Sequence, residues 1–193
     1  IAWLMVPLIN TGPNPILKNR LEGKEPITPT ENEFLTHNLY EPELDQILSA
    51  IKKNQITNSG QSRIKVIFVP AYLNHLDGIF NKSYYELLLG CDLSVFPSYY
   101  EPWGYTPLES IAYKVPTITT SLSGFGQWVI QHYESQEDIV RVLTRKEDNY
   151  EEFYQAIAAT ILEYTEKSAE ELRLIGDKAN AMARDFVWEN MIE

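Results

Sequence analysis

The sequence predicts an α/β fold in which helices cover both faces of a parallel sheet. Two observations lead to this prediction. Short apolar, β-branched runs alternate with longer segments of helical period, which is typical of βαβ units. Runs such as "KVIFV" and "LSVF" are almost wholly apolar, so the strands that they form should be buried on both faces.

The expected elements follow one another along the chain. Short runs of apolar or β-branched residues predict strands at residues 2–6, 64–69, 93–97, 117–120 and 139–143. Longer helical patterns occupy about residues 41–53, 83–90, 107–113, 126–132 and 150–166, and a last helix starts at about residue 169. Residues 10–36 are rich in Pro, Gly, Asn and Thr without a sustained period, so we expect a long surface excursion there.

Length and charge exclude several classes of protein. One core usually serves about 100–200 residues, so the 193 residues are expected to form a single domain. The formal net charge of −11 disfavours binding to nucleic acid or to an anionic membrane. No segment approaches the ~18 consecutive apolar residues of a membrane span.

Cysteine and histidine usage predicts neither a disulfide nor a metal site. Cys91 is the single cysteine, and within "LLLGCDLSVF" we expect a small buried thiol rather than a nucleophile. His37, His75 and His132 lack metal-ligand spacing and are expected to be surface or capping residues. A reducing, cytoplasmic location suits a chain without a cysteine pair.

Both ends of the sequence favour a piece cut from a longer protein. The chain opens on "IAWLMVPLI", without an initiator methionine, a basic region or a small-residue cleavage site. It closes on "ARDFVWENMIE", where Phe186, Trp188 and Met191 belong to a helical pattern and need a surface to pack on. We therefore expect part of any active site to lie outside these residues.

The stretch "FPSYYEPWGYTPLES", residues 96–110, is the expected place of a site. It leads from the carboxyl end of a predicted strand into a helix, and ligands of open α/β sheets bind at that edge. Thr106, Pro107 and Glu109 form a capping-box pattern, which predicts that the helix begins at Pro107. Gly104 lets the backbone approach a ligand closely, and the N–H groups of a first helical turn attract phosphate.

The two acids of this stretch suggest a sugar nucleotide. Carboxylates can bind vicinal hydroxyls, which a sugar and a ribose both supply, so Glu101 and Glu109 beside a phosphate site fit such a ligand. A plainer interpretation is equally open: Glu109 only completes its capping box, Glu101 is a solvated acid, and the rings belong to the core. A second turn in "SLSGFG", with Ser123 and Gly124, could bring further backbone donors to the same ligand.

Three stretches carry a resemblance to a known family. In their order and spacing, "KVIFVPAYL", "YYELLLGCDLSVFPSYYEPWGYTPLES" and "VPTITTSLSGFG" resemble the glycogen synthases of animals and fungi. The pair "FPSYYEPWGYTP" and "SGFG" is much narrower than the E-x7-E pattern that many retaining glycosyltransferases share. The resemblance covers residues 64–126 and implies that residues 1–193 are a truncated C-terminal Rossmann-like domain, the donor-binding half of a two-domain enzyme.

The resemblance implies a retaining glucosyltransferase that adds glucose from UDP-glucose to the non-reducing end of an α-1,4-glucan. By motif position, Glu101 would face the donor glucose as the catalytic residue, and Glu109 would hold the ribose hydroxyls. The other implied donor contacts are Gly104, Tyr105 and Thr106 at the diphosphate, Tyr84 and Tyr72 around uracil, Trp103 as a wall of the site or a wedge beneath the loop, and Ser123 and Gly124 in the second turn. The nucleotide sugar is a substrate, so no cofactor is implied.

Several alternatives stay open at this point. Tyr84 shares a helical face with Leu87 and Leu88, so it could be a packing residue, and Tyr85 could exchange roles with it. The enzyme could use another nucleotide sugar, with ADP in place of UDP, or another acceptor. Alternatively, the aromatic loop could belong to a noncatalytic module that binds carbohydrate or a partner protein.

The family pattern also places functional groups outside this sequence. Its donor-phosphate Arg and Lys lie upstream and its acceptor-side histidine lies in the N-terminal domain, so we expect residues 1–193 alone to be inactive, since such groups often contribute about 3 kcal/mol each. A homo-oligomer is compatible with the family. Its animal and fungal members sense glucose 6-phosphate through an arginine-rich helix, but "EKSAEELRLIGDKANAMARDF" holds few cations among its acids, so we expect no such activation.

Overall fold

The computed structural model describes residues 1–26, 33–133 and 138–186. The chain divides into two compact units, Ile1–Tyr84 and Tyr85–Glu193, and each is described by itself. Within the described residues, no helix is both long and apolar enough to cross a membrane.

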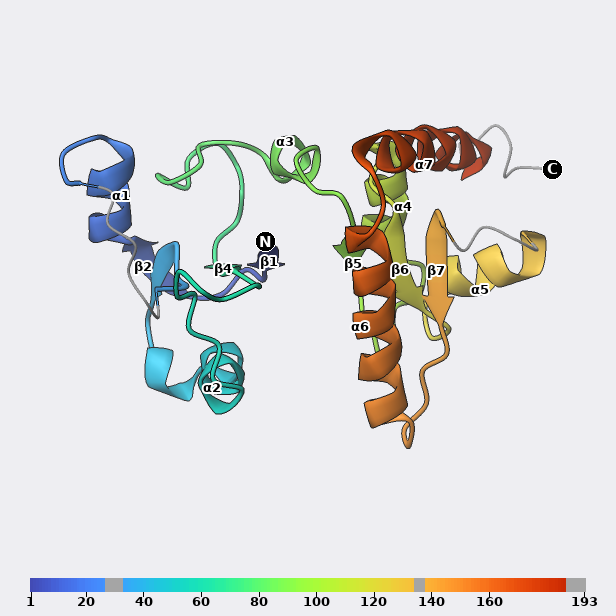
Figure 1. Cartoon of the computed structure of the whole chain (residues 1–193), viewed down its shortest axis with the longest axis horizontal. Coiled ribbons are helices and arrows are strands. Elements are labelled where there is room, and N and C mark those ends of the chain that lie inside the picture. Colours follow the sequence, from blue (N-terminus) through green and yellow to red (C-terminus); the bar gives the residue numbers. More distant parts are fainter. Residues whose placement is uncertain (27–32, 134–137, 187–193) are drawn as a thin grey trace. The chain divides into compact units, whose positions relative to one another are not determined.

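The first unit is built on β4 (Val66–Val69), which pairs in parallel with β1 (Ala2–Met5) and buries Phe68 and Val69 completely. A second pair, β2 (Asn10–Pro13) and β3 (His37–Leu39), is antiparallel. The helical elements of this unit are α1 (Pro15–Leu21), η1 (Pro42–Leu44) and α2 (Gln46–Lys53), as Figure 1 shows. Helix α3 (Tyr84–Leu88) begins at the last residue of the unit.

The second unit holds a three-stranded parallel sheet in the order β5 (Ser94–Val95), β6 (Thr117–Thr120) and β7 (Val140–Leu143). All four residues of the central strand β6 are buried. Around the sheet lie α4 (Tyr105–Ala112), α5 (Gly124–His132), α6 (Tyr150–Thr165), α7 (Ala169–Ala183) and η2 (Arg184–Phe186), visible in Figure 1.

Helices cover both faces of this sheet. Val140 of β7 belongs to a hydrophobic cluster with side chains of α4, α5, α7 and η2. The next residue, Arg141, donates instead to Glu163 of α6, with Nη2 3.0 Å from Oε2. Since successive side chains of a strand point to opposite faces, α6 covers the face opposite the cluster. The parallel sheets with flanking helices confirm the predicted α/β class.

The observed elements match the predicted ones at most positions, and every predicted strand overlaps an observed one. The predicted 41–53 helix is wrong in one respect, because it breaks at Asp45. There the Asp45 carboxylate accepts a hydrogen bond from the Leu48 N–H (2.7 Å) and starts α2 as its N-cap. Within residues 10–36 the structure forms β2 and α1, which the sequence analysis did not predict, and β3 follows directly. The expected positions Trp188 and Met191 lie outside the described residues.

Candidate active site

The loop that follows β5 is fixed by main-chain hydrogen bonds to the start of α5. The Glu101 N–H donates to the Leu122 carbonyl (3.3 Å), and the Glu101 carbonyl accepts from the Gly124 N–H (3.0 Å). The Phe125 N–H donates to the Trp103 carbonyl at 2.6 Å. Glu101 is therefore held at the carboxyl edge of the sheet through its backbone. Its half-buried carboxylate meets no hydrogen-bond donor among the residues that the structure describes.

The second glycine turn is what lets this loop approach so closely. A Cβ atom on Gly124 would lie 2.2 Å from the Pro102 carbonyl oxygen, and one on Gly126 would lie 2.3 Å from the Thr120 carbonyl oxygen. Helix α5 begins at Gly124, two residues earlier than predicted, and Ser123 is its N-cap, with Oγ accepting from the Gly126 N–H (3.0 Å). The first N–H groups of α5 are thus bonded within the chain, where they hold the loop that carries Glu101.

Helix α4 begins at Tyr105, and its N-cap is Gly104 in a left-handed conformation with φ 108°. The predicted capping box of Thr106 and Glu109 is wrong, since no side chain of the described residues caps this helix. The physical reason is that Gly104 turns the chain into the helix two residues early, which puts Thr106 inside the first turn. The N–H groups of Tyr105 and Thr106 have no carbonyl partner within the helix, and both residues are exposed.

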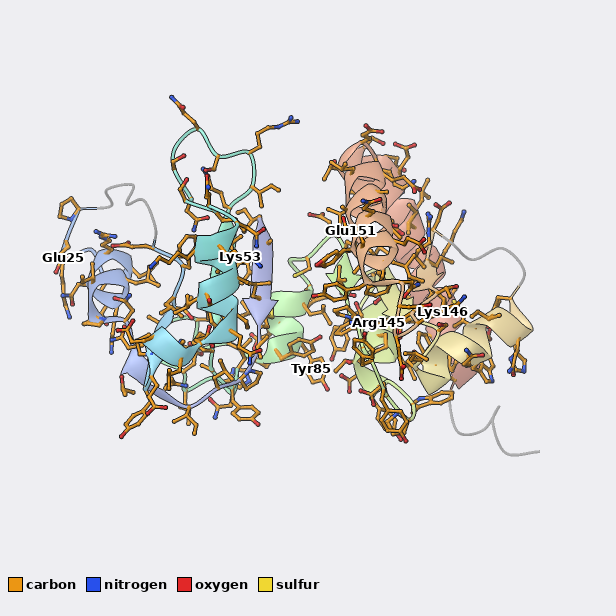
Figure 2. The ribbon with its side chains drawn as sticks, turned by 90° about the horizontal axis from the view of Figure 1, so that it is seen from below. Glu25, Lys53, Tyr85, Arg145, Lys146 and Glu151 are labelled. Carbon is orange, nitrogen blue, oxygen red and sulfur yellow. The ribbon has the colours of Figure 1, made fainter. Side chains whose placement is uncertain are left out.

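Glu109 is therefore not a capping acid. Its Oε1 accepts a hydrogen bond at 3.0 Å from the hydroxyl of Tyr85, a residue labelled in Figure 2. The Tyr85 ring stacks on Tyr113, with 5.0 Å between centroids and 13° between planes. The hydrogen bond to the Glu109 carboxylate raises the pKa of the Tyr85 hydroxyl, which further favours the protonated form that donates. Tyr85 thus orients Glu109 from the neighbouring helix.

Trp103 packs beneath the loop. Its ring meets Phe125 and Phe186 edge-on, at centroid distances of 6.3 and 6.4 Å. Of the two roles considered for Trp103, this contact favours the wedge. Cys91 is half-buried, and burial, with a smaller effect of the Asp92 charge, raises the pKa of its thiol. A raised pKa disfavours the thiolate, as expected for an inert cysteine.

In the first unit, the segment between Tyr72 and Tyr84 folds back on itself. The Tyr84 N–H donates to the Leu73 carbonyl (3.3 Å), and Asn74 pairs with Ser83 in an antiparallel bridge. These contacts bring the two tyrosines to the base of one narrow loop. Tyr72 is 77% exposed, as a base-stacking residue requires, whereas Tyr84 is half-buried.

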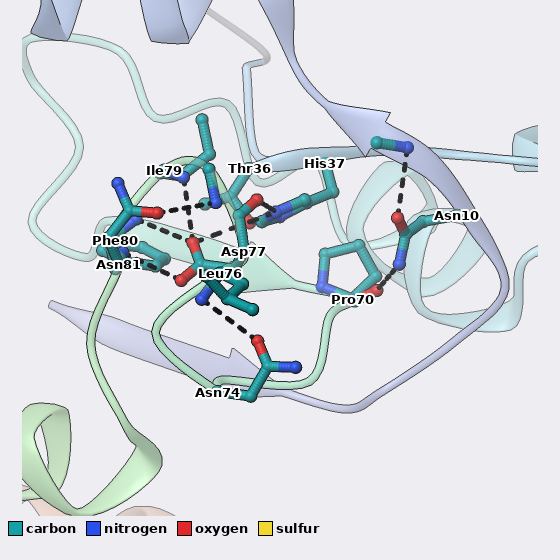
Figure 3. Close-up of polar contacts among 12 residues, drawn as sticks. Asn10, Thr36, His37, Pro70, Asn74, Leu76, Asp77, Ile79, Phe80 and Asn81 are labelled. Atoms are coloured by element: carbon teal, nitrogen blue, oxygen red, sulfur yellow. Dashed lines mark hydrogen bonds and ion pairs between the residues drawn. The ribbon is translucent and has the colours of Figure 1, made fainter.

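A buried polar cluster closes the tip of this loop (Figure 3). The Asp77 carboxylate accepts from the N–H groups of Ile79 (2.9 Å), Phe80 (2.7 Å) and Asn81 (2.8 Å). His37 of β3 lies beneath it, with Nε2 2.8 Å from the Asp77 carbonyl oxygen. The expectation that His37 is a surface or capping residue is wrong, because its ring is buried and joins β3 to this loop. No sequence signal pointed to this role, because β3 was not among the predicted strands.

Sequence reasoning also missed Arg145, a buried residue just beyond the end of β7. It meets the loops that follow β5 and β6, through contacts with Pro97 and Ser121. Its position just after a predicted strand was the one signal that could have pointed to it, because all three parallel strands end at the same edge of the sheet.

Comparison of the sequence with known proteins identifies a family. The sequence model described as Glycogen synthase matches residues 21–192 of the chain. The chain belongs to the glycogen synthase family. The resemblance seen in the sequence is thereby confirmed, and the loops around Glu101 and Gly124 lie within the match.

Individual members of the glycogen synthase family match shorter parts of the chain. Glycogen [starch] synthase of Caenorhabditis elegans is 31% identical over 157 residues, which cover 81% of this chain and 23% of the relative. Isoform 2 of Saccharomyces cerevisiae is 45% identical over 104 residues, 54% of this chain and 15% of the relative. The liver glycogen [starch] synthase of Mus musculus is 45% identical over 97 residues, which cover 50% of this chain and 14% of the relative. The chain thus spans less than a quarter of the length of these relatives.

Proposed function

We propose that the chain is the donor-binding part of a retaining glucosyltransferase of glycogen synthase type, which transfers glucose from UDP-glucose to the non-reducing end of an α-1,4-glucan. One observation carries this proposal. The backbone of Glu101 is clamped at the carboxyl edge of the sheet, while its carboxylate is not bonded to any described residue. An acid held in this way is ready to meet the hydroxyl groups of a ligand.

The geometry suggests which residues bind each part of the donor. Glu101 binds the glucose hydroxyls and positions the anomeric carbon. The diphosphate lies at the first turn of α4, where the N–H groups of Tyr105 and Thr106 are free of helical bonds and Gly104 leaves room for the approach. Glu109 holds the ribose, oriented by the Tyr85 hydroxyl.

The remaining assignments follow the family pattern. Tyr72 and Tyr84 stack on uracil. Ser123 and Gly124 depart from that pattern, since they hold the loop in place instead of donating to the ligand. The leaving diphosphate lies on the same face as the incoming hydroxyl, so retention requires no nucleophile from this chain. The N-terminal domain binds the acceptor glucan, and upstream Arg and Lys side chains of the family pattern neutralise the diphosphate. We further propose that the intact enzyme works in the cytoplasm and needs no cofactor.

Calorimetry on the full-length protein tests the proposal directly. We expect UDP and UDP-glucose to bind and ADP to bind more weakly. A preference for ADP would instead indicate a transferase with another nucleotide sugar. Binding of a linear glucan oligosaccharide without any nucleotide binding would contradict catalysis and favour a carbohydrate-binding module.

The Tyr85→Phe substitution should weaken donor binding without slowing the chemical step. Removing one hydrogen bond that orients Glu109 costs about 1 kcal/mol, so we expect KM for UDP-glucose to rise about fivefold at unchanged kcat. The matched control is Tyr113→Phe, which keeps the ring stack and the Glu109 hydrogen bond. Equal kinetics of Tyr85→Phe and Tyr113→Phe would show that the hydroxyl does not orient Glu109.

Glucose 6-phosphate should not activate the full-length enzyme. Arg173 of α7 is paired with Glu170 (2.7 Å) and Asp177 (3.3 Å), and Lys114 is paired with the same Asp177 (2.8 Å). These carboxylates neutralise cations that a sugar phosphate would need. Initial rates measured with and without saturating glucose 6-phosphate should agree, and a several-fold increase would contradict this expectation.

A further inference from the structure

We propose that Arg145 is a positioning residue that holds the Glu101 loop in its reactive place. The inference deepens the proposed function, on which it rests, and concerns a side chain that does not itself touch the donor. Arg145 lies in the second unit, two residues after the end of β7. It is 9% exposed.

The guanidinium group of Arg145 is held between two aromatic rings. Its carbon Cζ lies 3.8 Å from the centroid of Tyr99 and 4.4 Å from that of Phe153. Tyr99 belongs to the loop after β5, and Phe153 belongs to α6, so the stack joins the loop to the body of the unit. Arg145 and the exposed Lys146 that follows it are labelled in Figure 2.

Arg145 also makes hydrogen bonds to two neighbouring strand ends. Its Nη1 donates to the Pro97 carbonyl at 2.7 Å, and its backbone N–H donates to the Ser121 hydroxyl at 3.0 Å. One buried residue therefore connects the segments that follow β5, β6 and β7. These segments form the edge of the sheet at which ligands of α/β folds bind.

Only an arginine has the shape for this arrangement. The guanidinium is flat, so it can offer both faces to aromatic rings while its N–H groups donate in the plane. A lysine ammonium would keep the charge but could not lie between the two rings and reach the carbonyl in the same way. In the described part of the chain, no carboxylate forms an ion pair with Arg145. The rings and carbonyl thus take the place of a counter-ion.

The contacts of Arg145 complete the fixation of the loop. Residue 101 is held from one side by the start of α5, and the Ser98 carbonyl accepts from the Thr120 hydroxyl at 2.8 Å. Arg145 holds the other side, at Pro97 and Tyr99. Without it, the loop would keep the hydrogen bonds at residues 98 and 101 but lose those contacts that hold Pro97 and Tyr99. Glu101 would then sample positions away from the donor sugar.

The test compares Arg145→Lys, Arg145→Ala and Tyr99→Leu in the full-length protein, with Lys146→Ala as the control for loss of a positive charge. A misplacement of about 1 Å can cost about 100-fold in rate, so we expect Arg145→Lys to lower kcat by a factor of that order with KM for UDP-glucose nearly unchanged. Tyr99→Leu should lower kcat in the same direction. Added guanidinium ion should restore part of the activity of Arg145→Ala and none of any loss in Lys146→Ala, a difference that a general salt effect would not give.

Amide hydrogen exchange of residues 97–101 supplies a readout that does not depend on activity. We expect faster exchange there in Arg145→Lys and Tyr99→Leu, with the strand residues 117–120 unchanged. If Arg145→Lys keeps both the wild-type kcat and the wild-type exchange of the loop, the inference is overturned. If the wild-type protein transfers no glucose from UDP-glucose but its loop loosens in Arg145→Lys, the proposed function fails while the anchoring by Arg145 stands.

Discussion

Glu101→Gln should lower glucosyl transfer by the full-length protein by about 100-fold or more. A carboxylate that accepts two hydrogen bonds from sugar hydroxyls contributes about 1.5–3 kcal/mol per bond, and each 1.4 kcal/mol is a factor of about ten in rate. Glutamine has nearly the same shape but is neutral and replaces one acceptor by a donor. Initial rates at saturating UDP-glucose and glucan measure the effect.

The same Glu101→Gln substitution should leave the fold intact. The carboxylate has no hydrogen-bond partner within the described residues, and the loop is held by backbone groups that the substitution keeps. We therefore expect the midpoint of thermal unfolding to change by no more than about 2 °C. Glu147→Gln, at an exposed acid of the same unit, is the matched control. Near-normal turnover of Glu101→Gln would remove Glu101 from the catalytic role.

Gly124→Ala should damage both stability and turnover, although alanine is normally the better helix former. The added Cβ would lie 2.2 Å from the Pro102 carbonyl oxygen, which belongs to backbone and cannot swing aside. The loop must move away, and the hydrogen bond from the Gly124 N–H to the Glu101 carbonyl should weaken or break. We expect a loss of about 2 kcal/mol in the free energy of unfolding and a fall in turnover of about 100-fold.

The control for Gly124→Ala is Gly60→Ala in the first unit, where an added Cβ meets no atom within 4 Å. Chemical denaturation of the two variants separates a general effect of alanine from the specific clash. Unchanged stability and turnover of Gly124→Ala would mean that the loop does not need its close approach to α5.

The elements that the sequence predicted well are those with a strong local preference. Strand β6 has the predicted bounds, since its four residues are all β-branched and favour a strand. The helix starts were less accurate where tertiary contacts decide them. The T-P-L-E pattern matched a capping box, yet the left-handed backbone of Gly104 begins α4 two residues earlier.

Short elements without a buried face gave no signal. Helix α1 has no buried residue, and its start depends on the Asn14 side chain, which accepts from the N–H groups of Ile16 and Leu17. Strand β2 contains Gly12 and Pro13, which propensity assigns to turns. Such elements are set by local caps and by a partner strand distant in the sequence.

The residues of the candidate site also fall into those that could be predicted from the sequence and those that could not. Glu101, Glu109 and the glycine turn could be predicted because they lie close together in the sequence, within residues 96–126. Arg145 and the His37–Asp77 pair could not, because their roles include the His37–Asp77 and Arg145–Pro97 contacts, which join residues 40 or more positions apart. Distance in sequence hides the residues that position a site.

The clamp on Glu101 is made by the main chain, and this separates the position of the loop from the identity of its outward side chains. Tyr100, immediately before Glu101, is 80% exposed although its neighbour is fixed by two backbone hydrogen bonds. A substitution at Tyr100 can therefore change the surface beside Glu101 without moving the backbone of the acid. Tyr100 is for the same reason a suitable attachment point for a fluorescent label that reports on the loop.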